Sequence, residues 1–262
     1  MVNEIFDRKK VKLHRDKAAK YIFEHSFLVD FVINDICARL NDFTTNFANG
    51  LLIGAYRGIA PKKLMQTGKI NQLTSSDLSE KMLEGFSGPV TVCDDENLNF
   101  KPASFDIIIG CLNLHWINDV PATLFKIKAL LKPTGIFIAS FLGEETLKQL
   151  KQALIQAEIN ITGGAAPRIS PYIDVKTIGA LMQRTGFKKP IIDCDRLTAN
   201  YSSVFSLADE LSKMGESAAF YDKPKLLTKK ILNEADKIYR NNSNNKNGIN
   251  ASFDIITITA LA

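Results

Sequence analysis

Short apolar runs that alternate with longer polar or helical stretches are the feature of this sequence that most limits its fold. After Gly50 these runs are LLIG (51–54), KINQLT (69–74), PVTVC (89–93), FDIIIGC (105–111) and GIFIASF (135–141). Parallel strands need a long crossover, usually a helix, between them, and the segments between these runs are long enough to supply one. The sequence therefore predicts a parallel sheet with helices on both faces.

Two late runs add strands to this sheet. Residues 190–201 (PIIDCDRLTANY) and 252–262 (SFDIITITALA) are rich in the β-branched residues that strands favour. The residues between them predict helices at 203–214 and 224–240, followed by an Asn-rich loop. We therefore expect a seven-stranded, mostly parallel α/β sheet with an antiparallel C-terminal strand.

The same pattern suggests how the chain is organised. Helical spacing over residues 8–40 predicts one or two helices ahead of the first strand. We expect a single domain over residues 1–262, made of an N-terminal helical segment (1–45), a cofactor-binding core (50–145) and a helical insertion (202–250) between the last two strands. That insertion would lie near the mouth of the substrate site.

Helix boundaries are marked by residues with known preferences. Pro121 suits the first turn of a helix, and Asp174 suits an N-cap. Gly186 suits the position just after a helix, where a left-handed backbone is common. The stretch 144–160 is strongly helical and ends at a Gly163-Gly164 break.

Composition excludes several classes of protein. The longest apolar runs are far shorter than the roughly 20 residues of a membrane span, and the charged N-terminus does not resemble a secretory signal. Glu4, Asp7 and Asp16 also argue against a mitochondrial presequence, so we expect a bacterial cytoplasmic protein, or a matrix protein if the source is a eukaryote. The four cysteines and three histidines show no metal-ligand spacing, so no metal site is expected.

Basic residues are concentrated at the N-terminus although the net charge is only +5. Such a run forms either a solvated helix face or a surface for an acidic partner or substrate. Nucleic acid is an unlikely partner because no aromatic stacking platform accompanies the charge. The run comprises Arg8, Lys9, Lys10, Lys12, Arg15, Lys17 and Lys20.

Candidate site residues follow the predicted strands, because ligands of open α/β sheets bind at the carboxyl ends of the strands. Gly54 and Gly58 flank the first turn, where a nucleotide could approach the backbone; a tight turn without a ligand is the alternative. Asp77 follows the second strand and could accept hydrogen bonds from a ribose, or could cap a helix. Asp94 follows the third strand and could accept from an adenine amine.

The fourth strand ends at the place where the reacting end of a cofactor would lie. Asn113, His115 and Trp116 are found there, and His115 could act as a base or an orienting group. The alternative is that His115 packs beside Trp116 and satisfies a backbone group. Leu78, Asp95 and Cys111 adjoin these positions and complete the predicted cofactor-binding set.

Several longer segments resemble a known family. They are FDIIIGCLNLHWINDVPATLFKIKALLKPTGIFIASFLGEETLKQL, ISPYIDVKTIGALMQRTGF, DRLTANY and KMGES. These segments are similar to the methyltransferase-domain assembly factors of respiratory complex I and their alphaproteobacterial relatives, which in turn resemble the malonyl-carrier-protein methyltransferase of biotin synthesis. The resemblance runs from FDRKK near the start through nearly the whole chain.

This resemblance implies a Rossmann-like class I S-adenosylmethionine (SAM) dependent methyltransferase fold. It also implies that Gly54 and Gly58 belong to the SAM-binding glycine motif, Asp77 to the ribose contact and Asp94 to the adenine contact. The family's first motif has an acid where this chain has Leu52 and a central glycine where it has Tyr56. Each change would weaken SAM binding by about 1–3 kcal/mol, which is the cost of losing a hydrogen bond to a charged group. Together the two changes predict a loss of about a hundredfold in SAM affinity.

Two functions therefore compete. The first is a SAM-dependent methyltransferase, or another enzyme of the same fold, that acts on a protein or carrier-protein substrate such as a complex I subunit. The second is an assembly factor whose SAM motif is eroded and which is either noncatalytic or a hydroxylase, since the resemblance associates the complex I factor with hydroxylation of an arginine. The fold alone does not separate these functions.

Overall fold

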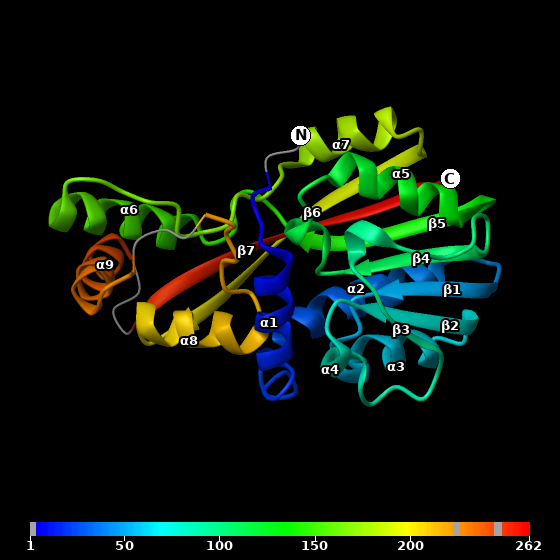
Figure 1. Cartoon of the computed structure of the whole chain (residues 1–262), viewed down its shortest axis with the longest axis horizontal. Coiled ribbons are helices and arrows are strands. Elements are labelled where there is room, and N and C mark those ends of the chain that lie inside the picture. The colour runs from blue at the N-terminus through cyan, green and yellow to red at the C-terminus, as the bar shows by residue number, and fades with distance from the viewer. Residues whose placement is uncertain (1–3, 223–225, 244–247) are drawn as a thin grey trace.

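The computed structural model describes residues 4–222, 226–243 and 248–262, and Figure 1 shows a twisted central sheet with helices on both faces. The strands are β1 (Phe47–Ile53), β2 (Ile70–Asp77), β3 (Val90–Val92), β4 (Phe105–Cys111), β5 (Leu131–Leu142), β6 (Lys188–Tyr201) and β7 (Ile249–Leu261). The α-helices are α1 (Arg8–Ala18), α2 (Phe27–Asp42), α3 (Ile59–Gln66), α4 (Glu80–Leu83), α5 (Val120–Leu130), α6 (Lys148–Thr162), α7 (Val175–Arg184), α8 (Val204–Met214) and α9 (Lys229–Asn242).

The seven strands form one sheet in the order β3-β2-β1-β4-β5-β7-β6. Strands β1 to β5 are parallel to one another, whereas β7 is antiparallel to both β5 and β6. The expected seven-stranded sheet with an antiparallel C-terminal strand is thus confirmed. The strand order reverses between β1 and β4, and this is where an open α/β sheet binds its ligand.

Successive side chains of the central strands point to opposite faces of the sheet, and this alternation divides the hydrophobic core into two clusters. On β1, Leu52 packs with α2 and α3, whereas Leu51 and Ile53 pack with α5 and α7 on the other face. Both faces of the central strands are buried, which explains the nearly continuous apolar runs in the sequence.

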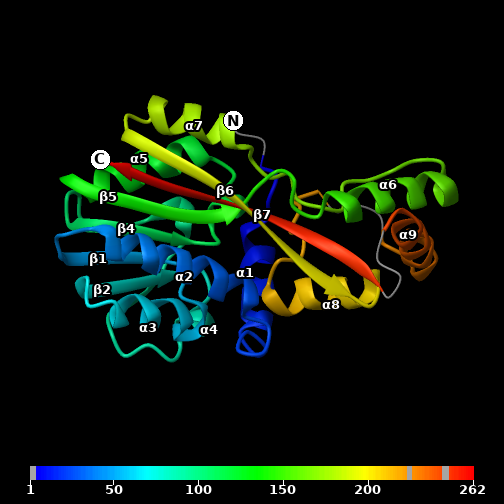
Figure 2. The same cartoon turned by 180° about the vertical axis from the view of Figure 1, so that it is seen from behind.

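The last two strands reach beyond the rest of the sheet. Residues 255–261 of β7 pair with β5, but the pairing of β7 with β6 continues to Ile249 opposite Tyr201. Helices α6, α8 and α9 gather around this extension, which forms an arm at one end of the molecule (Figures 1 and 2). The predicted helix at 203–214 matches α8. The predicted helix at 224–240 begins outside the described residues; α9 covers it from Lys229 onwards, whereas residues 226–228 are not helical.

Most helix boundaries follow the sequence signals. Pro121 lies in the first turn of α5, and Asp174 caps α7 by accepting a hydrogen bond from the Thr177 amide. Gly163 and Gly186 both have the left-handed backbone expected just after a helix. The prediction for 144–160 was wrong at its start, because residues 144–147 form a turn and Leu147 donates its amide to Ser252 of β7.

Helix α1 lies across the carboxyl ends of the parallel strands, between them and the arm (Figures 1 and 2). Its N-cap is Asp7, which accepts hydrogen bonds from the amides of Lys9 and Lys10. The chain before it pairs with residues 219–221, through the bridge between Phe6 and Phe220. Among the described residues, no helix has the length and apolar character to cross a membrane.

Candidate functional site at the carboxyl ends of the strands

The turn after β1 has an unusual left-handed backbone. Gly54 has φ +97°, and a Cβ at this position would lie 2.4 Å from the carbonyl oxygen of Cys111. Gly58 has φ +80°, and its Cβ would lie 2.7 Å from the carbonyl oxygen of Gly85. Both glycines are therefore required by the fold itself, as in the alternative of a tight turn that needs no ligand.

Tyr56 stands between these glycines, at the place of the family's central glycine. It adopts φ +47°, which is rare for a side chain of this size, and it is fully buried. Its hydroxyl donates to the carbonyl oxygen of Leu112, 3.1 Å away, and so links the turn after β1 to the turn after β4. Burial raises the pKa of Tyr56 well above its usual value, so the phenol stays protonated and can act as this donor.

Asp77 ends β2 and is only 1% exposed. Its Oδ1 accepts from Arg15 Nε and from the Ser79 amide, each at 2.9 Å. Its Oδ2 accepts from Arg15 Nη2 at 2.5 Å and from the Ala55 amide at 3.0 Å. The suggestion that Asp77 caps the following helix is wrong, because Ser79 is the N-cap of α4.

Arg15 comes from α1 and joins Asp77 to Tyr56. Besides its two bonds to the carboxylate, its Nη1 donates to the Tyr56 hydroxyl at 3.2 Å, and its guanidinium carbon lies 4.6 Å from the centre of the Tyr56 ring. The Arg15 side chain is 8% exposed, so this ion pair is largely removed from water.

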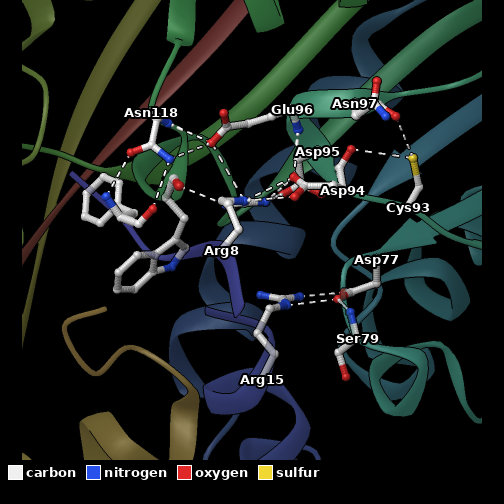
Figure 3. Close-up of polar contacts among 12 residues, drawn as sticks. Arg8, Arg15, Asp77, Ser79, Cys93, Asp94, Asp95, Glu96, Asn97 and Asn118 are labelled. Carbon is white, nitrogen blue, oxygen red and sulfur yellow. Dashed lines mark hydrogen bonds and ion pairs between the residues drawn. The ribbon is translucent and has the colours of Figure 1, made fainter. Parts of the chain in front are cut away.

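A second arginine of α1 holds the loop after β3. Arg8 donates to Asp94 through Nε at 3.1 Å and Nη2 at 2.8 Å, and its Nη1 donates to the carbonyl oxygen of Trp116 at 2.8 Å. Asp95 lies beside it, with Oδ2 3.6 Å from Arg8 Nη2, and burial raises the pKa of Asp95 to about 6. Figure 3 shows both arginines directed from α1 towards the acids at the strand ends.

The end of β4 holds the remaining candidates. His115 Nδ1 accepts from the Leu142 amide at 3.3 Å, as the packing alternative predicted, and His115 Nε2 lies 2.9 Å from Glu216 Oε2. The Asn113 side chain is buried, and its amide nitrogen and oxygen have no hydrogen-bond partner within the described residues. Burial raises the pKa of the Cys111 thiol to about 12.

Leu78 lies away from these polar groups. It is half-buried and packs against a small apolar cluster made of Phe6, Val11, Trp116 and Ala219. Its predicted place beside a cofactor therefore stays a prediction. Within the parts of the chain that the structure describes, no group of three or more His, Cys, Asp or Glu side chains is placed to hold a metal ion.

A cavity of about 470 Å³ lies beside α1, among the helices of the arm and the segments 167–172 and 216–220. Its charged and aromatic polar lining includes Lys10, Arg168, Tyr172 and Glu216, and its apolar lining comes largely from α6, α8, α9 and residues 226–227. Glu216 reaches the cavity from the segment after α8, and its side chain is 2% exposed. We refer to this space as the Glu216 cavity.

The sequence analysis missed three of the residues that define this region: Arg8, Arg15 and Glu216. The two arginines were assigned only to a basic run, yet they are seven residues apart, which places them on one face of a helix. That spacing was the available signal, since a buried carboxylate at a strand end needs a cationic partner. Glu216 was included only within the segment KMGES that carries the family resemblance, and no local signal gave it a role.

Comparison with known proteins identifies the family to which this chain belongs. The chain is 32% identical over 259 residues to the human protein named "Arginine-hydroxylase NDUFAF5, mitochondrial", with 96% of this chain and 75% of the human protein covered. The chain belongs to the NDUFAF5 family. A Rickettsia prowazekii protein that carries a provisional methyltransferase name is 36% identical over 173 residues, which is 66% of this chain and 76% of that protein.

Methyltransferases are the wider group around this NDUFAF5-family chain. The family described as "Methyltransferase domain" matches residues 51–139. A malonyl-[acyl-carrier protein] O-methyltransferase of Coxiella burnetii is 26% identical over 219 residues, covering 84% of this chain and 75% of that protein. The resemblance inferred from the sequence is thus confirmed, and the chain is a class I SAM-dependent methyltransferase-like protein.

Solved structures confirm the fold. A methyltransferase of Bacillus halodurans superimposes with a TM-score of 0.61 at 12% identity, covering 87% of this chain and 97% of the other. A phosphoethanolamine methyltransferase of Haemonchus contortus, solved with S-adenosylhomocysteine (SAH), superimposes with a TM-score of 0.52 at 18% identity, covering 87% of this chain and 52% of the other. The fold is therefore the SAM-binding methyltransferase fold.

The residues of this NDUFAF5-family chain do not fit SAM in the arrangement observed. Both oxygens of Asp77 are taken by donors within the chain, and Asp94 is held by Arg8. Leu52 is buried in the apolar core, where it offers no hydrogen bond. Buried polar atoms that lack a hydrogen-bond partner among the described residues, including the Asn113 amide and Trp116 Nε1, favour a ligand at this end of the sheet.

Proposed function

We propose that the chain is an assembly factor that binds a segment of a partner protein in the Glu216 cavity and recognises an arginine side chain there. The observation that carries this proposal is the Glu216 carboxylate, which is almost fully buried yet lines the cavity. Burial of a carboxylate is costly unless hydrogen bonds or a counter-charge compensate it. A guanidinium supplies both, since its planar N–H groups match the carboxylate geometry.

His115 orients Glu216 for such a ligand. In neutral His115, Nδ1 accepts from the Leu142 amide, so the proton is on Nε2 and is donated to Glu216 Oε2. This arrangement fixes the carboxylate and leaves Oε1 as the oxygen that can accept from an incoming guanidinium. His115 is therefore a positioning residue in this proposal.

The charge of the cavity favours an arginine over a carrier-bound malonyl group. A malonyl group carries a free carboxylate, which Glu216 would repel. Two cations also line the cavity, but both are engaged within the chain. Arg168 donates from Nε to Glu158 at 2.9 Å, and Lys10 Nζ donates to the carbonyl oxygen of Phe220. The relatives' printed name, arginine hydroxylase, agrees in naming an arginine as the group acted upon.

Hydroxylation of that arginine is accordingly the reaction to test first, with methylation as the alternative. Dioxygen would supply the inserted oxygen atom, and an added two-electron reductant with two protons would convert the other oxygen atom to water. Mass spectrometry separates the two, because hydroxylation adds an oxygen atom to the substrate and methylation adds the mass of a methylene group. A complex I subunit is the expected partner, by the resemblance of the chain to complex I assembly factors. A bacterial cytoplasmic location, or the matrix to which the relatives' name "mitochondrial" points, stays a prediction.

Peptide binding tests the recognition step directly. Fluorescence anisotropy would be measured with labelled peptides that tile the complex I subunits of the same organism, each arginine peptide being paired with a copy that carries neutral citrulline. A hydrogen bond to a charged group contributes about 1.5–3 kcal/mol, so at least one arginine peptide should bind about tenfold or more tighter than its citrulline copy.

Glu216→Gln should abolish this preference. Asp209→Asn is the matched control, because it removes one negative charge from the exposed face of α8, where Asp209 pairs with Lys213. Equal binding of all arginine and citrulline pairs by the wild-type protein would refute the proposal. An arginine preference that survives in Glu216→Gln would refute the role given to Glu216.

A further inference from the structure

We infer that the cofactor site of this chain is closed from within: Arg15 and Tyr56 engage the groups that would hold the ribose and methionine ends of SAM, so the folded protein does not bind SAM. This inference goes beyond the proposed function and does not depend on it. It concerns a different set of side chains, namely Arg15, Tyr56 and Asp77.

The first argument is the number of donors on Asp77. A carboxylate has about four lone-pair positions, and Asp77 already accepts from two nitrogens of Arg15 and from the amides of Ala55 and Ser79. The two hydroxyls of a ribose would have to displace the guanidinium. That exchange replaces charge-assisted hydrogen bonds with weaker neutral ones and leaves a buried arginine without its counter-ion.

The second argument is the space that Tyr56 occupies. Its ring replaces the hydrogen atom of the family's central glycine and is held on both sides, by Leu112 through its hydroxyl and by the guanidinium of Arg15 over its face. Moving the Tyr56 ring out of this position costs free energy, because the movement breaks both contacts. The turn after β1 therefore presents an aromatic ring where a methyltransferase presents bare backbone.

The third argument is that α1 is anchored in the closing position. Arg8 and Arg15 lie on the same face of the helix, seven residues apart, and both reach the strand ends (Figure 3). The other side of α1 is held by the segment after α8: His14 Nδ1 lies 3.0 Å from the Ser217 carbonyl oxygen, and the Asp7 amide donates to Ala219. Opening the site requires both sets of contacts to break.

Calorimetric titration of the full chain with SAH and with SAM tests the inference. We expect no binding by the wild-type protein at millimolar ligand. The variant Arg15→Ala/Tyr56→Gly/Leu52→Asp removes the closing groups and restores the family's motif, and we expect it to gain binding by at least about a hundredfold, the loss worked out from the sequence. Lys17→Ala is the control, because Lys17 is an exposed cation on the same helix.

A second measurement covers the case in which the triple variant does not fold. Hydrogen exchange of the Ala55 and Ser79 amides, which donate to Asp77, would be followed in the wild-type protein with and without SAH. We expect slow exchange that SAH leaves unchanged. Micromolar binding of SAM or SAH by the wild-type chain, a change in this exchange on adding SAH, or a folded triple variant that gains no affinity would each overturn the inference. Arginine-peptide binding is read separately, so either proposal can fail alone.

Discussion

Replacement of Arg15 by methionine should lower the free energy of unfolding by about 4 kcal/mol. Removal of one partner of a buried ion pair costs about 3–5 kcal/mol, because the remaining charge is left without compensation. Asp77 keeps its two backbone donors, from Ala55 and Ser79, which favours the lower end of that range. Loss of the hydrogen bond from Arg15 Nη1 to Tyr56 adds about 1 kcal/mol.

Urea denaturation at neutral pH would measure this loss in a double-mutant cycle of wild type, Arg15→Met, Asp77→Asn and the double variant. Each single variant leaves one buried group unpaired, whereas the double variant leaves neither charge. We therefore expect the double variant to lose about 2–3 kcal/mol less than the sum of the two single losses. Methionine retains much of the arginine's apolar bulk, so the cycle reports the charges more than a cavity.

Lys17→Met on the exposed side of α1 provides the control and should change stability by less than about 0.5 kcal/mol. A loss below about 1 kcal/mol for Arg15→Met would mean that Arg15 is not a buried counter-ion. Losses that simply add in the double variant would mean that Arg15 and Asp77 do not stabilise each other. Either result would refute the view that this chain uses Asp77, the acid at the family's ribose-contact position, for stability.

Three further predictions concern the surroundings of the site. Burial raises the pKa of Asp95 from 3.8 to about 6, so the folded state favours the protonated carboxyl. The stability that this protonation gives is complete below about pH 4 and is lost as the pH rises through about 6. Asp95→Asn should therefore stabilise the chain by about 2–3 kcal/mol at pH 8 but hardly at all at pH 4, as urea denaturation at the two pH values would show; equal effects would contradict the shift. Gly54→Ala should cost at least about 3 kcal/mol in thermal unfolding, because its Cβ would meet the Cys111 carbonyl oxygen at a left-handed backbone, and a smaller loss would mean that the turn relaxes. Glu158→Gln should weaken the buried pair with Arg168 and speed proteolysis of the loop that Arg168 holds against α6, and unchanged cleavage would mean that the pair does not fix this loop.

The sheet was predictable from the sequence because each strand carries its own signal. Residues 105–111 form an apolar run, interrupted only by Asp106, that is bounded on both sides, and β4 has those bounds. The signals for the ends of α6 and α7 were equally local, because each is a glycine just after the helix, Gly163 and Gly186, with a left-handed backbone. The start of α6 was missed because the amide of Leu147 bonds to β7, more than a hundred residues away, and this contact stops the helix from beginning earlier.

The site was predictable only in part, for the same reason. The order of glycines and acids predicted which residues lie at the carboxyl ends of the strands, and Gly54, Asp77 and Asp94 do lie at or just after the ends of β1, β2 and β3. What the sequence did not show is which donors those acids already have. Asp77 and Arg15 are 62 residues apart, and Glu216 and His115 are 101 apart, so both pairs depend on how α1 and the arm pack against the sheet.

The glycines and the acids of this region therefore carry different kinds of information. Gly54 and Gly58 are required by backbone contacts within the chain, so a protein of this fold needs them whether or not it binds a cofactor. Asp77 is different, because a ribose-binding carboxylate must keep acceptors free for the ligand, whereas a structural carboxylate is saturated by the protein. The partners of Asp77, and the side chain at the position of Tyr56, are thus the features that separate a working SAM site from a retained fold. The glycine pattern would be the same in a protein that binds SAM and in one that only retains the fold.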